Sequence, residues 1–214
     1  MSTLLLRLAG PMQSWGTDSK FDVRRTGREP SKSGVIGLVA AALGIRRQDR
    51  EGLNKLLSLR FGVRVDREGS MMRDFQTAEG ESKYVTYRYY LADAVFVAGL
   101  ESEDTELLQQ IGRAIEAPAF PLYLGRRSCP PVGRVFLGIY DKPLEETLRE
   151  TALSDSTRLV LDAVEGEPGG LVRDVPLSFD PAWREYTYRR VTEKFLRESV
   201  RFPTEHDPMA ELEG

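Results

Sequence analysis

Apolar and polar residues follow regular patterns along most of the first two thirds of the chain. Alternation with β-branched or aromatic side chains indicates strands, and a repeat of about 3.6 residues indicates amphipathic helices. These patterns predict strands at Thr3–Leu8, Leu59–Val65, Tyr84–Leu91, Ala94–Leu100 and Val132–Tyr140. They also predict a helix at Val35–Leu43 that ends at Gly44 and is apolar nearly all round, a helical turn at Leu53–Leu57, and a helix at Thr105–Ile115.

The order of these elements predicts the fold class. It is β-α-β, a polar excursion at Asp66–Lys83, and β-α-β, which is the βαββαβ arrangement of a ferredoxin-like α+β domain. We expect this domain to occupy residues 1–140. Strand-like runs at Arg158–Val164 and Glu185–Val191 predict that residues 141–214 are a small β-rich extension packed on it, with a mobile acidic tail at 203–214.

The composition excludes several classes of protein. With 214 residues and 41% hydrophobic side chains, the chain can bury one core, which excludes a disordered tail and a disulfide miniprotein. A single cysteine, Cys129, and a single histidine, His206, can form neither an internal disulfide nor a four-ligand zinc site. The longest apolar run, Gly34–Ile45, is about half a membrane span. We therefore expect a cytoplasmic protein without signal peptide, membrane anchor, metal or cofactor.

The net charge of −3 hides an uneven distribution of charge. Between Lys20 and Arg50 there are eight basic residues against three acidic ones, and between Ala117 and Tyr140 the only charged side chains are three arginines. Guanidinium groups suit phosphate oxygens and stack on bases better than ammonium groups do. Two basic segments therefore favour contact with nucleic acid. A bias of the genome or an adaptation to heat could also explain why the chain uses arginine more often than lysine.

The pair Lys32–Ser33 stands directly before a predicted helix. A nucleotide-binding P-loop requires glycines at the positions that Thr26 and Ser31 occupy here, so the spacing argues against one. What remains is a helix N-terminus with free N–H groups, Ser31 or Ser33 as cap, and Lys32 beside it. Such an arrangement suits one phosphate group. The alternative is an ordinary capped helix with a solvated lysine.

The loop Tyr123–Pro131 carries two adjacent arginines, Arg126 and Arg127. Because Gly125 permits a close backbone approach and two prolines stiffen the loop, the two guanidinium groups could meet successive phosphates. Solvated arginines are the alternative. We expect Cys129 in the same loop to be a small packing residue, since no histidine lies near it in sequence.

The excursion at Asp66–Lys83 carries three large apolar residues, Met71, Met72 and Phe75. If it is a hairpin that projects from the body, Met72 and Phe75 near its tip could separate bases of a nucleic acid. If it folds back, the same residues join the core. His206 lies in the acidic tail, and we expect no catalysis from it.

Four segments resemble, in this order, the Cas-five family of CRISPR-associated proteins in its type I-E branch. They are Pro30–Leu38 with the alanine-rich helix that follows, Arg73–Thr77, Arg88–Phe96 and Tyr123–Pro130. The resemblance covers about Thr3–Tyr140 strongly and the rest loosely. The K/R-G-F/Y-G/A-F-V-x-F/Y signature of RNA-recognition modules is absent. We therefore expect binding through the basic loops and not by stacking on an open sheet face.

This resemblance implies an RNA-recognition-type domain with a protruding thumb hairpin at about 66–90, in a non-catalytic subunit of a Cascade surveillance complex. It implies that the chain binds the 5′ handle of CRISPR RNA and caps the backbone filament. Its neighbours would be a CasC-type backbone subunit and a CasA-type large subunit, and it would meet target DNA only through the complex. The resemblance assigns handle phosphates to Lys32, Ser33, Arg126 and Arg127, with Arg24 and Arg25 as helpers, and the thumb contacts to Met72 and Phe75.

Two other functions stay open at this point. In type I-C systems a relative in the family itself processes the repeat RNA, so a metal-independent repeat endoribonuclease is one alternative. A subunit that caps the complex through protein contacts alone is the other. Cleavage of repeat RNA distinguishes the first alternative from a scaffold, and co-purified nucleic acid distinguishes the second.

Overall fold

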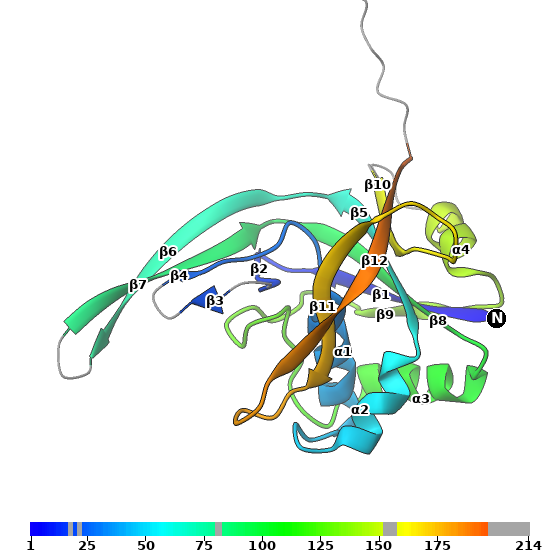
Figure 1. The fold of residues 1–214 in the computed structure, drawn as a ribbon, viewed down its shortest axis with the longest axis horizontal. Helices are drawn as coiled ribbons and strands as arrows, with labels where there is room; N and C mark the ends of the chain where they lie inside the picture. Colours follow the sequence, from blue (N-terminus) through cyan, green and yellow to red (C-terminus); the bar gives the residue numbers. More distant parts are fainter. Residues whose placement is uncertain (17–18, 21–22, 80–82, 152–157, 197–214) are drawn as a thin grey trace, which may run out of the picture.

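The computed structural model describes residues 1–16, 19–20, 23–79, 83–151 and 158–196 of the chain. Figure 1 shows a body of mixed helices and strands from which one long β-hairpin extends to the left. The predicted α+β class is confirmed. The predicted acidic tail at 203–214, with His206, lies outside the described residues.

An antiparallel sheet of seven strands, in the order β11-β12-β10-β5-β8-β1-β9, forms the centre of the body. Its strands are β1 (Ser2–Ala9), β5 (Arg60–Arg67), β8 (Val95–Ser102), β9 (Phe136–Tyr140), β10 (Arg158–Asp162), β11 (Gly170–Ser178) and β12 (Glu185–Phe195). Strand β9 begins four residues later than the predicted Val132, because Pro130, Pro131 and Gly133, with φ +76°, hold a loop there.

The helices α1 (Lys32–Leu43), α2 (Arg50–Leu57) and α3 (Thr105–Glu116) lie in the parts of the chain where helical structure is predicted. Along the chain, β1-α1-β5 is followed by the hairpin and then by β8-α3-β9. Across the sheet these four strands are neighbours in the order β5-β8-β1-β9. The elements therefore follow the βαββαβ order, with the hairpin inserted in its middle.

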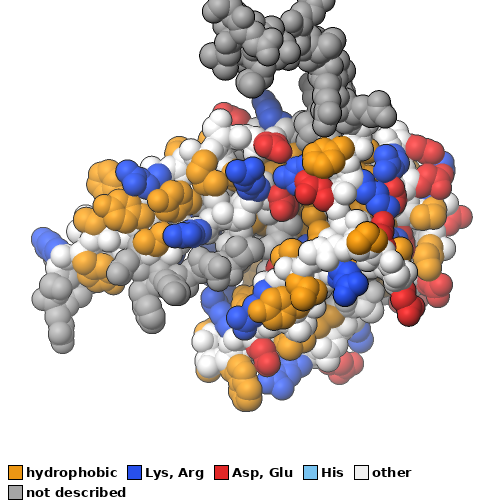
Figure 2. All heavy atoms as spheres, turned by 45° about the horizontal axis from the view of Figure 1, so that its top comes forward, with side chains coloured by type: hydrophobic (Ala, Val, Ile, Leu, Met, Phe, Trp, Pro, Cys, Tyr) orange, Lys and Arg blue, Asp and Glu red, His pale blue; other side chains and the backbone are white. Residues whose placement is uncertain are grey.

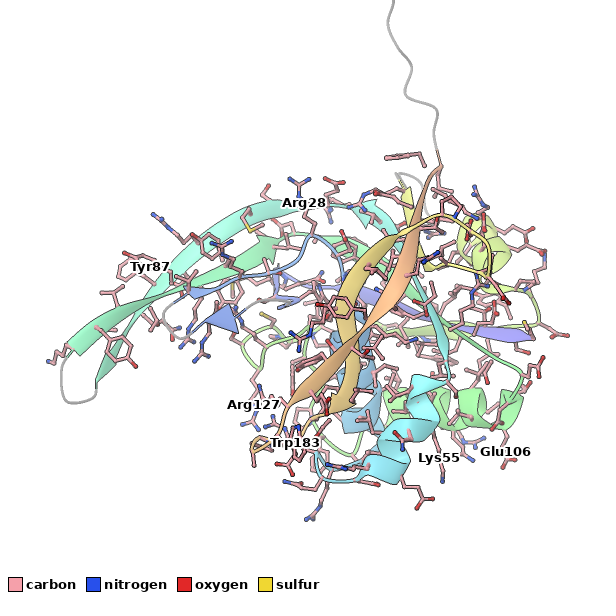
Figure 3. All side chains as sticks on the ribbon, in the orientation of Figure 1. Arg28, Lys55, Tyr87, Glu106, Arg127 and Trp183 are labelled. Carbon is pink, nitrogen blue, oxygen red and sulfur yellow. The ribbon has the colours of Figure 1, made fainter. Side chains whose placement is uncertain are left out.

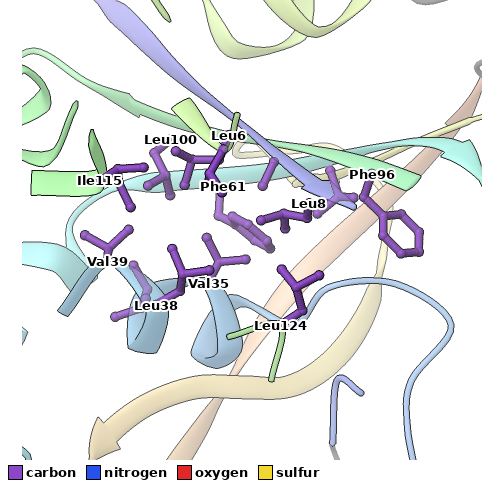
Figure 4. Packing of buried hydrophobic residues seen from close by; sticks show 14 of the residues in the cluster. Leu6, Leu8, Val35, Leu38, Val39, Phe61, Phe96, Leu100, Ile115 and Leu124 are labelled. Atoms are coloured by element: carbon purple, nitrogen blue, oxygen red, sulfur yellow. The ribbon is translucent and has the colours of Figure 1, made fainter. Parts of the chain in front are cut away.

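Side chains alternate between the two faces of β1 and so reach two different clusters. Leu4, Leu6 and Leu8 join the main core with α1 and α3, part of which Figure 4 shows. Leu5 joins a smaller cluster on the opposite face, where α4 (Leu144–Glu150) packs. Sequence patterns missed α4, because it is short and its N-cap, Pro143, provides no side-chain hydrogen bond.

Helix α1 is fixed at both ends by local hydrogen bonds. The Ser31 hydroxyl accepts a hydrogen bond from the Gly34 N–H, and Gly44 ends the helix with φ +76°, in the left-handed conformation. The helix contacts α2, α3 and β11 as well as the core, which explains its apolar surface. Its N-terminus consequently lies where the C-terminal strands meet the body.

A second sheet contains the hairpin. Its strands are β2 (Met12–Gln13), β3 (Ser19–Lys20), β4 (Val23–Arg24), β6 (Ser70–Glu79) and β7 (Lys83–Ala92). Strands β6 and β7 pair along their whole length, and β4 pairs in parallel with β7 through Val23↔Tyr87 and Arg24↔Arg88. The segment that carries Arg24 therefore lies against the hairpin.

The C-terminal residues extend the central sheet, since β10 pairs with β5. Sequence patterns missed β11, because its three buried residues, Asp174, Pro176 and Ser178, do not give an apolar alternation. No helix in the described part of the chain is long and apolar enough to cross a membrane.

Candidate nucleic-acid interface

The loop Tyr123–Pro131, between α3 and β9, holds its two arginines on a fixed backbone. The Leu124 N–H donates to the Cys129 carbonyl at 2.7 Å, and the Cys129 N–H donates to the Arg126 carbonyl at 2.9 Å. Leu124 and Cys129 are buried, while Gly125 adopts φ +83° directly against the Ser14 backbone. Burial raises the pKa of the Cys129 thiol above its usual value, despite the nearby Ser128 and Arg126, which fits a packing role.

Arg126 connects this loop to the base of the hairpin. Its guanidinium group lies over the Tyr90 ring, 4.8 Å from the centroid, and Nη2 donates a hydrogen bond to the Arg24 carbonyl at 2.9 Å. Its Nη1 is buried without a partner among the described residues. The side chains of Arg24 and Arg25 are exposed beside it. The structure thus brings Arg24, Arg25 and Arg126 together at one place.

Arg127, the next residue, is exposed and lines an open groove of about 920 Å³. Figure 3 shows Arg127 close to the turn between β11 and β12. The basic residues that line the groove are Arg46, Arg47, Arg127 and Arg184, and Ser33 lines it as well. Among the described residues that line the groove there is no Asp or Glu. The groove is therefore suited to an anion with several charges.

Part of the groove lining is apolar, and there α1 and Trp15 pack closely because residue 34 is a glycine. A Cβ on Gly34 would lie 2.7 Å from the Trp15 ring, so only a glycine lets α1 approach this side chain so closely. Trp15 is fully buried, and its indole N–H donates to Gln13 Oε1 at 3.1 Å. The Trp15 backbone N–H donates to Thr26 Oγ1 at 2.8 Å. These bonds fix parts of the long segment between β1 and α1 against the groove.

Lys32, which the resemblance assigned to an RNA phosphate, is engaged within the protein in this structure. Its side chain is buried, and Nζ forms an ion pair with Asp162 at 3.0 Å. Its backbone N–H donates to Asp174 Oδ2 at 2.7 Å, so a carboxylate of this chain occupies the helix N-terminus where a phosphate was expected. Ser33, in contrast, is partly exposed and faces the groove.

Arg189 completes this buried ionic cluster, which we call the Asp174 cluster and which consists of Lys32, Asp162, Asp174 and Arg189. Arg189 binds Asp174 through Nε at 2.6 Å and Nη2 at 2.9 Å, and it binds Asp162 through Nη1 at 2.8 Å. Burial alone would lower the pKa of the Arg189 guanidinium, but Asp174 and Asp162 outweigh burial and raise that pKa above its usual value. The cluster joins α1 to β10, β11 and β12.

The hairpin exposes an aromatic and basic surface. Phe75 is 66% exposed and lies opposite Tyr87 in the β6–β7 register. The Arg73 guanidinium lies over the Tyr87 ring, 5.3 Å from the centroid. Figure 2 shows hydrophobic and basic side chains gathered along the hairpin. Met72 differs from Phe75, because it is partly buried and packs against the main core.

This difference in burial predicts losses of stability of different size for two alanine substitutions. Phe75→Ala should change the free energy of unfolding by less than about 0.5 kcal/mol, since its ring is exposed. Met72→Ala should lower the free energy of unfolding by about 1 kcal/mol or more, because removal of the Met72 side chain leaves a gap against the core. Urea denaturation followed by circular dichroism measures both values. Equal losses for the two variants would contradict the packing described here.

Sequence reasoning missed several residues of the interface. Arg46 and Arg47 belong to the basic segment between Lys20 and Arg50, but no spacing marked them as groove residues. Arg184 stands in the C-terminal part, which sequence patterns treated as an addition to the domain. No signal in the sequence joins it to Arg127, because their proximity results from the pairing of β10 with β5. In the described ranges, no three His, Cys, Asp or Glu side chains form a group that could hold a metal ion.

Comparisons with known proteins agree with one another. A family model described as CRISPR-associated protein (Cas_Cas5) matches residues 3–192. The CRISPR system Cascade subunit CasD of Escherichia coli (strain K12) is 39% identical over 158 residues, which cover 64% of this chain and 70% of that protein.

Two solved structures are similar over most of the chain. One, a crystal structure of a Cas protein, is 42% identical with a TM-score of 0.72, covering 91% of this chain and 94% of that one. The other, a chain of a CRISPR RNA-guided surveillance complex, is 34% identical with a TM-score of 0.76, covering 90% of this chain and 89% of that one. The family match extends over nearly the whole described chain, and the chain therefore belongs to the Cas5 family of CRISPR-associated proteins.

Proposed function

We propose that this chain is the non-catalytic subunit of a type I-E Cascade complex that binds the 5′ handle of CRISPR RNA and caps the backbone filament. The observation that carries the proposal is the groove, which four arginines line without any Asp or Glu among the described lining residues. Similarity to Cascade subunit CasD and to a chain of an RNA-guided surveillance complex supports it. A cytoplasmic location is part of the proposal.

In this proposal the β5-β8-β1-β9 core with α1 and α3 is a ferredoxin-like, RNA-recognition-type scaffold. The hairpin β6–β7 is its thumb, with Phe75 exposed for contact with bases and Met72 supporting the base of the hairpin. The RNA follows the groove and then the hairpin base, so its phosphates meet the residues Arg24, Arg25, Ser33, Arg46, Arg47, Arg126, Arg127 and Arg184. Lys32 is no longer in this set.

The two arginines of the loop have different tasks. Arg126 already uses Nη2 and one face of its guanidinium group within the protein, and its Nη1 is buried, so it meets the RNA only through the atoms that stay accessible and chiefly keeps the Arg24 backbone in place. Arg127 is exposed and offers a whole guanidinium fork, which can bind a phosphate through two hydrogen bonds. A loop of this kind combines one positioning arginine with one binding arginine.

The neighbours in the complex are, in this proposal, a CasC-type backbone subunit, a CasA-type large subunit and, through the complex, target DNA. Co-expression of the chain with these neighbours and a CRISPR array tests the binding claim. We expect RNA that carries the 5′ handle to co-purify with the complex. If the same proteins assemble with this chain and the complex contains no RNA, the proposal is contradicted. That result would favour a subunit that caps the complex through protein contacts alone.

A cleavage assay tests the non-catalytic claim. The full chain is incubated with end-labelled repeat RNA, with and without a divalent metal ion, and no specific product is expected. A matched assay with His206→Ala identifies the alternative. A product that the unaltered chain forms and the His206→Ala variant does not would replace the scaffold proposal with a repeat endoribonuclease.

A further inference from the structure

The β11–β12 hairpin reaches from the edge of the central sheet to the groove. At its middle, Arg189 of β12 and Asp174 of β11 are joined to each other and, through the Asp174 cluster, to α1 and β10. Phe179, at the end of β11, is partly buried against the main core. The hairpin is consequently held to the body on the side that faces α1.

The turn at the end of this hairpin has its own hydrogen bonds. Asp180 accepts from the Ala182 N–H through Oδ1 at 2.9 Å and from the Trp183 N–H through its carbonyl at 3.1 Å. The Asp180 N–H donates to the Ser178 hydroxyl at 3.2 Å. These bonds fix the backbone of the turn and therefore the position from which the Trp183 side chain starts.

Trp183 is 65% exposed on this fixed turn. Its chain neighbour Arg184 lines the groove, as do Tyr186 on β12 and Arg127 on the opposite loop. Figure 3 shows Trp183 and Arg127 at neighbouring positions below the β11–β12 hairpin. The Trp183 side chain does not itself line the groove, but it stands on a hydrogen-bonded turn directly before Arg184, which does.

We propose that Trp183 stacks on a nucleobase of the bound RNA, next to phosphates that Arg184 and Arg127 hold. The inference rests on the proposed function and extends it to a part of the chain that sequence patterns assigned no binding role. Aromatic rings bind single-stranded RNA in this way because every base offers a flat π face, whereas arginines alone hold the backbone. Trp183 would thus fix the base that lies at the mouth of the groove.

A protein partner is the competing occupant of an exposed tryptophan. The charge around Trp183 favours RNA, since the groove beside it is lined by Arg46, Arg47, Arg127 and Arg184. The nearby carboxylate of Asp180 is used within the turn, and Glu185 is not among the groove-lining residues. Single-stranded RNA provides both the negative charges and the flat apolar groups that this rim can bind.

Fluorescence provides a direct test, because the chain has two tryptophans and the other one, Trp15, is fully buried. The full chain is titrated with a synthetic RNA of the 5′ handle sequence, and the emission that the Trp183→Phe variant lacks is followed. We expect stacking to quench this emission. Trp183→Ala should raise the Kd by about tenfold, and Trp183→Phe should raise it by less than about threefold, because a phenyl ring still stacks.

The control variant is Tyr188→Ala. Tyr188 is 60% exposed on the same hairpin, but unlike Trp183 it has no groove-lining residue next to it in the chain, so its removal should leave both Kd and quenching unchanged. If the unaltered chain binds the RNA without quenching of the Trp183 emission, and Trp183→Ala binds it equally well, the inference about Trp183 is wrong and the proposed function stands. If the unaltered chain does not bind the RNA, the proposed function fails and this inference fails with it.

Discussion

Asp174→Ala is expected to lower the free energy of unfolding by about 3–5 kcal/mol, the range for removing one partner of a buried ion pair. The substitution leaves the largely buried Arg189 with Asp162 as its remaining partner in the Asp174 cluster, and it removes the acceptor of the Lys32 N–H. Urea denaturation followed by circular dichroism measures the loss. Hydrogen exchange should show reduced protection of β11 and β12, because the cluster joins them to α1.

Glu116→Ala is the matched control for this prediction. Glu116 pairs with Arg134 at 3.0 Å on the surface, where both side chains are largely exposed. Such pairs contribute about 0–1 kcal/mol, so this variant should unfold nearly like the unaltered chain. The description of the Asp174 cluster would be contradicted if Asp174→Ala and Glu116→Ala had the same small effect.

Gly125→Ala is expected to disturb the arginine loop without removing any charge. A Cβ at this position would lie 1.8 Å from the Ser14 carbonyl oxygen, and φ is +83°. The left-handed conformation alone costs about 1–2 kcal/mol, and the backbone clash must add to it. We expect more than about 2 kcal/mol of lost stability in urea denaturation. Affinity for handle RNA should fall by about tenfold, roughly 1.4 kcal/mol, because Arg126 and Arg127 leave their positions.

Gly166→Ala separates the two causes. Gly166 has the same φ of +83°, but a Cβ there would meet nothing within 4 Å. Its substitution should therefore cost about 1 kcal/mol and leave RNA affinity unchanged. Equal losses of stability for the two glycine variants would show that the clash between an added Cβ at position 125 and the Ser14 backbone contributes nothing to the loss.

Local patterns were sufficient to predict most of the elements that bury apolar faces, α4 being an exception. The strand β8 and the helix α3 follow from alternation and from helical repeats. Of the two predicted caps, Ser31 and Ser33, it is Ser31 that begins α1, and Gly44 ends the helix as predicted. Strand β11 could not be found in this way. Its buried positions include Asp174 and Ser178, whose burial is favourable only because Arg189, Lys32 and other partners come from elsewhere in the chain.

The candidate site shows the same difference between residues that local sequence identifies and residues whose partners are distant in the chain. Arg126 and Arg127 could be selected because a stiff loop presented them without neighbouring acids, and the structure brings them to one side of the body. Lys32 was assigned to RNA from its place at a helix N-terminus and from the resemblance, and its ion pair could not be foreseen because Asp162 is separated from it by 130 positions in the chain. Arg184 was overlooked because it is far from Arg127 in the sequence, and only the fold brings both arginines to the same groove.

The salt dependence of handle binding tests the central claim most directly. For single strands, log K falls by about 0.7 per neutralised phosphate per log unit of salt. The double variant Arg127→Gln with Arg184→Gln should therefore have a slope shallower by about 1.4, if each arginine binds one phosphate. The control, Arg113→Gln with Arg149→Gln, removes the same charge from exposed arginines outside the groove and should keep the original slope. An identical slope for the groove variant and the unaltered chain would contradict the assignment of the groove to RNA.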